Sequence, residues 1–327
     1  MVKTKKILVT GAGGFIGSHL TEKLSSLGCA VRAFVHYNSR NSWGWLDYSK
    51  HRENIEIISG DIRDTDIVRH AMRDVEIVFH LAALIGIPYS YYSPEAYVHT
   101  NIKGSLNILQ AAKDSGVEKV IITSTSEIYG TAQSIPIPET HPINPQSPYA
   151  ATKAAADLLA MSFYRSFDLP VIIIRPFNTY GPRQSARAII PTVITQILSG
   201  QKKVKLGALS PTRDLTYVED MVDGFIKAGE CAAAVGEIIN LGTNSEISIR
   251  DLARLISKHL NCDIKIKSEQ DRIRPEKSEV DRLMADNTKA SRILNWAPKC
   301  KLEEGLKKTI KWFKQNKNIY KSEIYNI

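Results

Sequence analysis

The chain has 327 residues, of which 43% are hydrophobic and 24% are charged, and its formal net charge is +9. This composition is ordinary for a globular protein and excludes a mainly disordered chain. The sequence holds no run of about 18 or more apolar residues. Glycines follow the N-terminal residues too soon for a signal-peptide core, so we expect a cytoplasmic protein with no membrane contact.

The positive charge and the cysteine spacing indicate which classes of ligand to expect. A basic surface raises the local concentration of anions, which suits a phosphate-bearing ligand. No nucleic-acid-binding motif accompanies the charge, so we expect no nucleic-acid partner. The four cysteines are scattered without CxxC spacing or a nearby histidine, and we predict no metal site.

Short β-branched runs alternate with longer segments of helical period in the first half of the chain. This alternation is typical of parallel sheets, so residues 1–180 predict a doubly wound α/β domain. Stretches rich in Pro, Gly and basic residues follow. We therefore predict that residues 181–327 form a smaller α/β substrate-binding lobe. Some strands or helices of this segment can return to the first domain. The predicted strands are residues 5–10, 29–35, 54–59, 75–80, 118–124 and 169–175.

A glycine-rich turn joins the first predicted strand to the first predicted helix. Gly11, Gly14 and Gly17, with Phe15 and Ile16 between them, let backbone amides approach a pyrophosphate at a helix N-terminus. This order of strand, glycines and helix predicts a Rossmann-type domain that binds a dinucleotide.

The end of the second predicted strand bears on the choice between NAD and NADP. NAD-binding domains carry an acidic residue there for the ribose hydroxyls, and this chain has none. It has His36 and Arg40 instead, and an arginine at this place accommodates the 2′-phosphate of NADP unless it lies in solvent on a long loop. We therefore favour NADP slightly over NAD. Asp61, after the third strand, is a candidate for adenine contact.

Tyr149 and Lys153 are four residues apart and therefore share one face of a predicted helix. A nearby ammonium lowers the pKa of a phenol, so we expect Lys153 to help Tyr149 take a proton from a substrate hydroxyl. Hydride would leave the same carbon for the nicotinamide. Together with the glycine turn, this pair predicts a catalytic site on the dinucleotide-binding fold.

These motifs resemble the extended short-chain dehydrogenase/reductase family over nearly the whole chain. The resemblance implies a Rossmann domain with a small sugar-nucleotide lobe, a homodimer, and a tightly bound cofactor that is regenerated in each turnover. It also implies that Ile62, Leu81, Ala82 and Ala83 border the cofactor. Further matching pieces are GDIRD at 60–64, HLAA at 80–83, Asn101, RPFNTYGPR at 175–183 and RIRPEKSEV at 272–280.

The residues after the fifth predicted strand indicate the reaction. Thr125, Ser126 and Glu127 resemble the Thr-Ser-Glu set of GDP-mannose 4,6-dehydratases. A carboxylate there can remove the proton from the carbon beside a new ketone, a step for which 4-epimerases have little use. We predict a 4,6-dehydration in which Tyr149 and Thr125 act at C4 and Glu127 acts at C5. Either Ser126 or Glu127 protonates the departing C6 hydroxyl.

Residues 34–47 and 175–200 resemble the dehydratase of the legionaminic-acid pathway, whose substrate is GDP- or UDP-N-acetylglucosamine. UDP-glucuronate decarboxylases share the Thr-Ser-Glu motif, so a decarboxylase and a 4-epimerase stay open as alternatives. A non-catalytic NAD(P)-binding regulator is a remote alternative, because it has no need of Tyr149, Lys153 and Glu127 together.

Four residues are predicted by resemblance to bind the nucleotide sugar, one just before residue 181 and three after it. Asn178 matches the family asparagine at the sugar diphosphate, and Arg213 and Arg274 match basic residues that grip phosphates. Guanidinium groups suit this work because they bond phosphate oxygens in pairs. Lys205 matches a segment that runs past the nucleobase.

Overall fold

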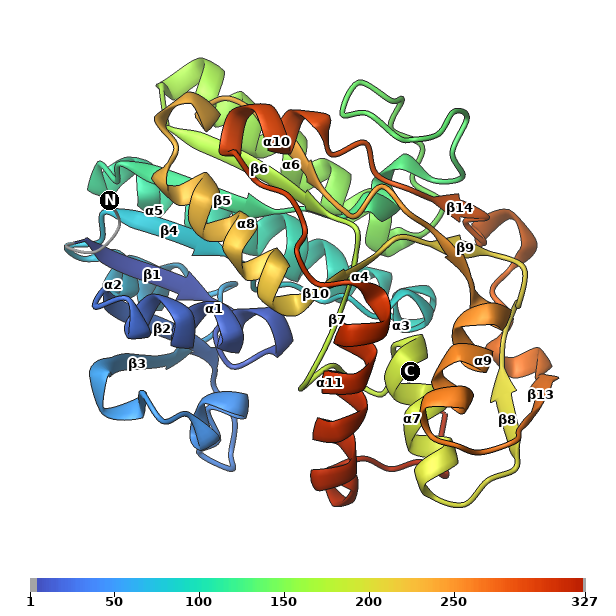
Figure 1. Ribbon diagram of the computed structural model, residues 1–327. Helices are drawn as coiled ribbons and strands as arrows, with labels where there is room; N and C mark the ends of the chain where they lie inside the picture. The colour runs from blue at the N-terminus through green and yellow to red at the C-terminus, as the bar shows by residue number, and fades with distance from the viewer. Residues whose placement is uncertain (1–4, 326–327) are drawn as a thin grey trace.

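The computed structural model describes residues 5–325, and a seven-stranded sheet lies at its centre (Figure 1). Every neighbouring pair of its strands is parallel. The predicted Rossmann-type α/β fold is confirmed. In spatial order the strands are β11 (Ile238–Leu241), β6 (Val171–Pro176), β5 (Lys119–Thr123), β4 (Ile77–His80), β1 (Lys6–Thr10), β2 (Ala30–His36) and β3 (Ile55–Gly60).

Helices cover both faces of the sheet, which is why its strands are continuous apolar runs rather than alternating ones. In β6, for example, all six residues are buried. One face carries α1 (Phe15–Ser26), α8 (Val218–Glu230) and α10 (Thr288–Leu294). The other face carries α2 (Thr65–Met72), α5 (Gly104–Ser115) and α6 (Pro148–Phe167).

The strand order reverses between β1 and β4, because the chain proceeds outward from β1 to β3 and then returns to the other side of β1. Such a reversal opens a crevice at the carboxyl ends of the strands, where ligands bind in folds of this kind. β11, α8 and α10 belong to this sheet domain although they follow residue 180 in the chain.

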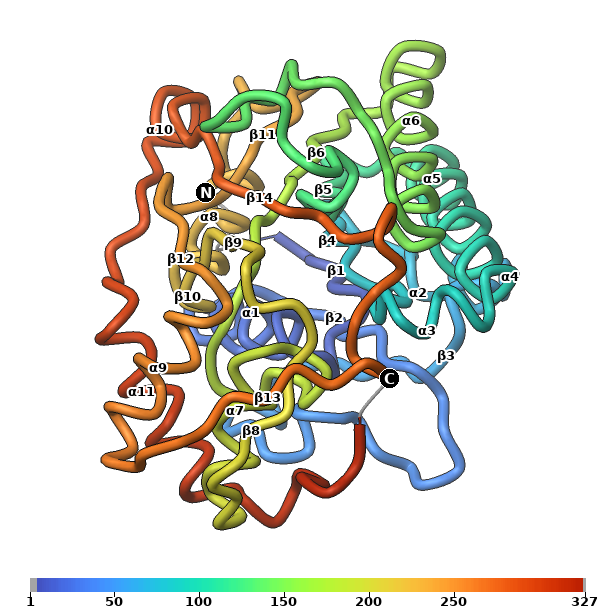
Figure 2. Tube along the Cα trace, turned by 90° about the vertical axis from the view of Figure 1, so that its right-hand side faces the viewer, coloured from blue at the N-terminus to red at the C-terminus, as the bar shows by residue number. Residues whose placement is uncertain are grey.

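The remainder of residues 181–327, together with residues 178–180, forms a smaller group of helices and short strands beside the crevice (Figure 2). Among residues 5–325, no helix has the length and apolar character needed to cross a bilayer. The helices of this group are α7 (Ile189–Leu198), α9 (Ile249–His259) and α11 (Leu302–Gln315). Its paired strands are β7 (Asn178–Tyr180) with β10 (Leu215–Tyr217), β8 (Lys203–Leu206) with β13 (Lys265–Ser268), and β9 (Thr212–Arg213) with β12 (Ile247–Ser248) and β14 (Arg282–Leu283).

Short helical turns connect the sheet to the crevice. They are η2 (Gly44–Tyr48) and η3 (Arg52–Asn54) after β2, α3 (Ile87–Tyr92), α4 (Pro94–Tyr97) and the π-helical η4 (Val98–Lys103) after β4, and η5 (Ser126–Tyr129) after β5. Further turns are η6 (Ala232–Ala234), η7 (Gln270–Arg272), η8 (Glu276–Ser278) and η9 (Lys317–Ile319).

Candidate active site

A cavity of about 1050 Å³ lies at the carboxyl ends of the parallel strands. Pockets for one small ligand usually hold about 300–1,000 Å³, so this cavity has room for a dinucleotide and a second ligand. All five residues predicted to be catalytic line it: Thr125, Ser126, Glu127, Tyr149 and Lys153. So do all the other residues predicted to bind the cofactor: Gly11, Gly14, Phe15, Ile16, Gly17, His36, Arg40, Asp61, Ile62, Leu81, Ala82 and Ala83.

The glycine turn leaves no space for side chains where a pyrophosphate would sit. A Cβ atom on Gly17 would lie 2.1 Å from the carbonyl oxygen of Gly11, and one on Gly11 would lie 2.8 Å from the backbone nitrogen of Ala82. Gly11 also has a φ of +67°, which L side chains rarely adopt. The turn therefore presents bare backbone at the start of α1, which fits the pyrophosphate of NAD(P).

The loop after β2 closes over this turn. The backbone nitrogen of Trp45 donates a hydrogen bond to the carbonyl oxygen of Gly13 at 3.0 Å. Trp43 lines the cavity with the Arg52 guanidinium over its ring, whereas Trp45 packs edge-on against Trp312. Trp43 is therefore placed to contact a ligand, and Trp45 anchors the loop.

Two arginines line the cavity just after β2 and β3. Arg40 is exposed at the cavity wall. Arg63 donates to both carboxylate oxygens of Asp61, through Nε at 2.9 Å and through Nη2 at 2.5 Å. This pairing lowers the pKa of Asp61 and keeps its carboxylate charged.

The loop after β4 is held against the cavity by buried polar side chains. Asn101 accepts a hydrogen bond from the backbone nitrogen of Leu84 at 2.8 Å and donates to the Leu84 carbonyl at 3.0 Å. His80 lies between Thr10 and Ser105, and burial lowers its pKa to about 3, so this ring is neutral. Both residues shape the site rather than react in it.

The first turn of α6 positions the catalytic pair. The Ser147 hydroxyl caps the helix by accepting from the backbone nitrogen of Ala150 at 3.1 Å, and Pro148 occupies the first helical position. Tyr149 follows at once and is 7% exposed. Lys153, one turn later, donates to the carbonyl oxygen of Thr123 at the end of β5.

Burial is the largest influence on the pKa of both Tyr149 and Lys153. Burial raises the pKa of Tyr149, and its hydrogen bond with Thr125 opposes the shift only in part. Burial also lowers the pKa of Lys153 to about 8, with Asp157 acting in the opposite direction. Desolvation penalises the charged form of each side chain, and for Tyr149 the nearby Glu127 and Asp157 raise the pKa further.

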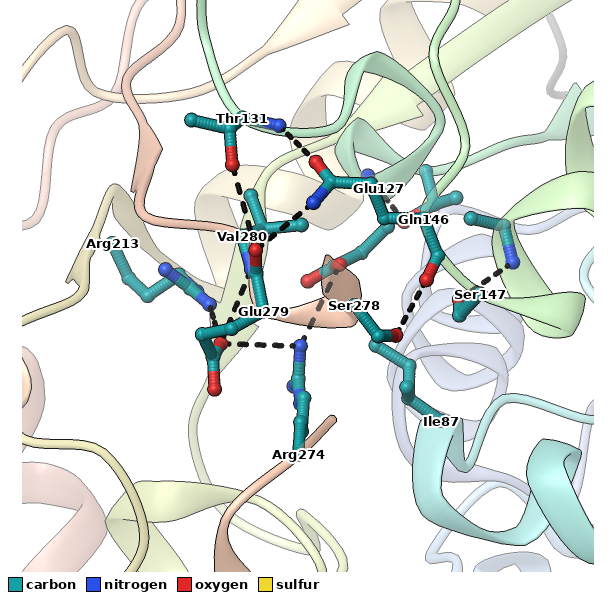
Figure 3. Close-up of polar contacts among 12 residues, drawn as sticks. Ile87, Glu127, Thr131, Gln146, Ser147, Arg213, Arg274, Ser278, Glu279 and Val280 are labelled. Carbon is teal, nitrogen blue, oxygen red and sulfur yellow. Dashed lines mark hydrogen bonds and ion pairs between the residues drawn. The ribbon is translucent and has the colours of Figure 1, made fainter. Parts of the chain in front are cut away.

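The turn η5 carries the remaining catalytic candidates. Thr125 caps it by accepting from the backbone nitrogen of Glu127 at 3.3 Å, which places Thr125 and Glu127 on the same cavity wall. The Glu127 carboxylate lies 3.8 Å from the Arg274 guanidinium (Figure 3). Ser126 lies between Thr125 and Glu127 in the sequence. Its side chain is buried and also lines the cavity.

The residues predicted to bind the nucleotide sugar occupy three different places. Asn178 and Arg274 line the cavity. Arg213 does not line it, and contacts Glu279 at 3.3 Å. Lys205 lies on β8, outside the cavity wall, and pairs with Glu269 at 2.9 Å.

Sequence reasoning missed two charged residues that line the cavity, Arg63 and Arg187, and one that contacts Arg274 beside it, Glu279. Arg187 lines the cavity and belongs to the segment 175–200, and Glu279 belongs to the segment 272–280. Both segments resemble known enzymes, but these two residues were not singled out within them. Glu279 lies about 150 positions from Glu127 along the chain, so no local pattern indicates that Arg274 links the two carboxylates.

The glycine turn, the Tyr149–Lys153 pair and the parallel sheet together define an enzyme of the NAD-dependent short-chain dehydrogenase/reductase superfamily. Within this superfamily the chain belongs to the GDP-mannose 4,6-dehydratase family, whose model matches residues 8–309. Its members and relatives include both 4,6-dehydratases and 4-epimerases of nucleotide sugars.

Three known proteins illustrate this similarity. The chain is 34% identical to UDP-glucose 4-epimerase of Mycolicibacterium smegmatis, over 94% of this chain and 98% of that protein. It is 32% identical to human dTDP-D-glucose 4,6-dehydratase, over 97% of this chain and 92% of that protein. The solved structure of DesIV, a dTDP-glucose 4,6-dehydratase from Streptomyces venezuelae with NAD bound, covers 96% of this chain and is itself covered to 98%, at 29% identity and a TM-score of 0.88.

Proposed function

We propose that the protein is a nucleotide-sugar 4,6-dehydratase that converts GDP- or UDP-N-acetylglucosamine to the 4-keto-6-deoxy sugar, in the biosynthesis of legionaminic acid or a related surface glycan. The observation that carries the proposal is the Glu127 carboxylate in the wall of a cavity that Thr125 and Tyr149 also line. A dehydratase requires a second acid–base group in addition to the residues that oxidise C4, and Glu127 in this wall supports the proposal.

The first step is oxidation at C4. Tyr149 takes the proton of the C4 hydroxyl, and Thr125 orients that hydroxyl by a hydrogen bond. The Lys153 ammonium stabilises the phenolate that Tyr149 needs for this step, and it also holds the cofactor ribose. A bound NAD(P) supplies one piece of chemistry, which is the temporary storage of the hydride that leaves C4 and later arrives at C6.

The second step is loss of water across C5 and C6. The 4-ketone acidifies C5, and Glu127 removes the C5 proton while the C6 hydroxyl departs. Ser126, or Glu127 itself, gives that hydroxyl the proton with which it leaves as water. Return of the hydride to C6 and of a proton to C5 completes the 6-deoxy sugar.

For the cofactor we propose NADP, with NAD as the alternative. Arg40 lies at the cavity wall next to the end of β2, where the 2′-phosphate of NADP would need a cation. The DesIV structure contains NAD, which favours the alternative. Binding titrations of the apoprotein with each dinucleotide decide between them, and Arg40→Ala should weaken NADP more than NAD.

A 4-epimerase is the second candidate, because several relatives carry that name. Epimerisation needs Tyr149, Thr125 and the cofactor but no proton transfer at C5. UDP-glucuronate decarboxylation uses the same C4 oxidation and is the third candidate.

The test is mass spectrometry of reactions of the purified protein with UDP- and GDP-N-acetylglucosamine and with UDP-glucuronate, each with NAD or NADP. Loss of one water from an N-acetylglucosamine nucleotide, without net reduction of the cofactor, would support the dehydratase and identify the base. Loss of carbon dioxide from the glucuronate would favour the decarboxylase. An unchanged mass with a new sugar isomer, resolved by chromatography, would favour the epimerase.

A further inference from the structure

Two arginines of the small lobe meet around one carboxylate next to the cavity. The Glu279 carboxylate lies 3.3 Å from Arg213 and 3.6 Å from Arg274, both measured to the same oxygen. Arg274 reaches the other way to Glu127 at 3.8 Å (Figure 3). Glu279 therefore stands between two like charges that would otherwise repel each other, and Arg274 stands between Glu279 and the proposed C5 base.

The Arg274 guanidinium has a hydrogen-bond donor left over for a further partner. Its Nη1 atom is buried and makes no hydrogen bond with any of residues 5–325, because its contacts with both carboxylates exceed hydrogen-bond length. The Asn178 side-chain oxygen is also buried and accepts no hydrogen bond from any of residues 5–325. Both Arg274 and Asn178 line the cavity. Buried polar atoms without partners are costly, so this wall is built for a polar ligand.

The segment that carries Glu279 is fastened to the catalytic half of the molecule. The Gln146 side chain donates to the carbonyl oxygens of Lys277 at 2.9 Å and Glu279 at 3.0 Å. The Ser278 hydroxyl donates to the Gln146 carbonyl and contacts the Tyr91 hydroxyl at 2.6 Å. Since Gln146 directly precedes the Ser147 cap of α6, the position of Glu279 is tied to the helix that carries Tyr149.

We propose that Glu279 is a positioning residue that holds Arg274, with Arg213 behind it, so that one guanidinium serves both the sugar diphosphate and Glu127. A negative charge at residue 279 keeps the two arginines side by side while the diphosphate is absent. The diphosphate then meets guanidinium groups that are already oriented, which lowers the cost of binding. This inference deepens the proposed function, because it concerns the same nucleotide-sugar site.

The test is calorimetric binding of UDP and GDP to the NAD(P)-loaded protein with the substitution Glu279→Gln. We expect the better-bound diphosphate to lose affinity about tenfold, as the loss of a charged hydrogen-bonding partner implies. Binding of NAD should not change. Glu276→Gln is the matched control, because Glu276 is exposed three residues earlier in the same segment. Wild-type diphosphate affinity in the folded Glu279→Gln protein would overturn the proposal.

A double-mutant cycle tests whether Glu279 acts through Arg274. The losses caused by Glu279→Gln and Arg274→Lys should be strongly non-additive, and additive losses would overturn the proposal. If Glu279→Gln does not fold, Glu279→Asp keeps the charge on a shorter side chain and should show a smaller loss of diphosphate affinity, whereas an unchanged affinity would again overturn the proposal. In turnover, Glu279→Gln should raise KM more than it lowers kcat. Because binding needs no turnover, failure of the dehydration assay and failure of this test can be told apart.

Discussion

Glu127 is the residue on which the proposed reaction type depends. The residue is 8% exposed and lines the cavity beside Thr125, and its carboxylate faces Arg274. Oxidation at C4 is assigned to other residues, so a change at Glu127 should separate the two halves of the reaction. The neighbouring Ser126 has no comparable charge, which makes Glu127 the better single test.

We predict that Glu127→Gln spares C4 oxidation and stops water loss. The amide keeps the size of the side chain but cannot accept the C5 proton, so water loss should slow by at least about 100-fold, the usual scale of general base catalysis. Reduced cofactor should then accumulate, measured by its absorbance, while mass spectrometry detects no dehydrated product. Ser126→Ala is the companion variant that asks which group protonates the C6 hydroxyl. Full turnover by Glu127→Gln would remove Glu127 from the mechanism.

At the scale of elements, the turn between β1 and α1 depends on close backbone contacts that only glycine permits. The Gly17 position approaches the Gly11 carbonyl oxygen so closely that a methyl group cannot fit without opening the turn. At Gly14 the same methyl group would lie 3.2 Å from that oxygen, which a small local shift can relieve. Gly17 therefore constrains the turn between β1 and α1 more strongly than Gly14 does.

We predict that Gly17→Ala destabilises the fold by about 1–3 kcal/mol, the usual cost of overpacking, and sharply weakens dinucleotide binding. The Gly14→Ala variant should lose less stability and less dinucleotide affinity. Thermal unfolding and dinucleotide titration on the two variants measure the difference. Equal dinucleotide affinity in Gly17→Ala and the wild type would show that this turn does not cradle the pyrophosphate.

At the scale of the whole molecule, α6 carries exposed apolar residues that do not line the active-site cavity. Leu158 is 64% exposed, and Phe167, at the end of the same helix, is 51% exposed. Ala151 and Ala155 precede Leu158 by about two turns and one turn on the same face, and their small side chains leave room for a second helix to approach. These features support the homodimer that the family resemblance implies, with α6 in its interface.

We predict a dimer in sedimentation velocity experiments and its dissociation by Leu158→Lys. A two-fold interface contains Leu158 twice, and losing the burial of two leucines should raise the dissociation constant by at least about 100-fold. Ile319→Lys, at an exposed apolar residue of η9, is the control. A monomeric wild type, or a stable dimer of Leu158→Lys, would contradict this assignment of the interface.

The sequence by itself determined the parts of the protein that depend on neighbouring residues. The strands β1 to β6, the glycine turn and the helix that carries Tyr149 and Lys153 all follow from local spacing, because periodicity and turn chemistry act over a few residues. Local spacing also sufficed to bring every predicted cofactor residue to one cavity, since the carboxyl ends of parallel strands meet at one edge of the sheet.

Only the tertiary structure decided how distant segments combine. The ion pair of Glu127 with Arg274 joins residues about 150 positions apart, and no local pattern encodes such a contact. The return of β11 to the sheet likewise depends on which apolar edge a late segment can cover. The raised pKa of Tyr149 follows from burial, which spacing along a helix does not reveal, because desolvation depends on everything packed around the side chain.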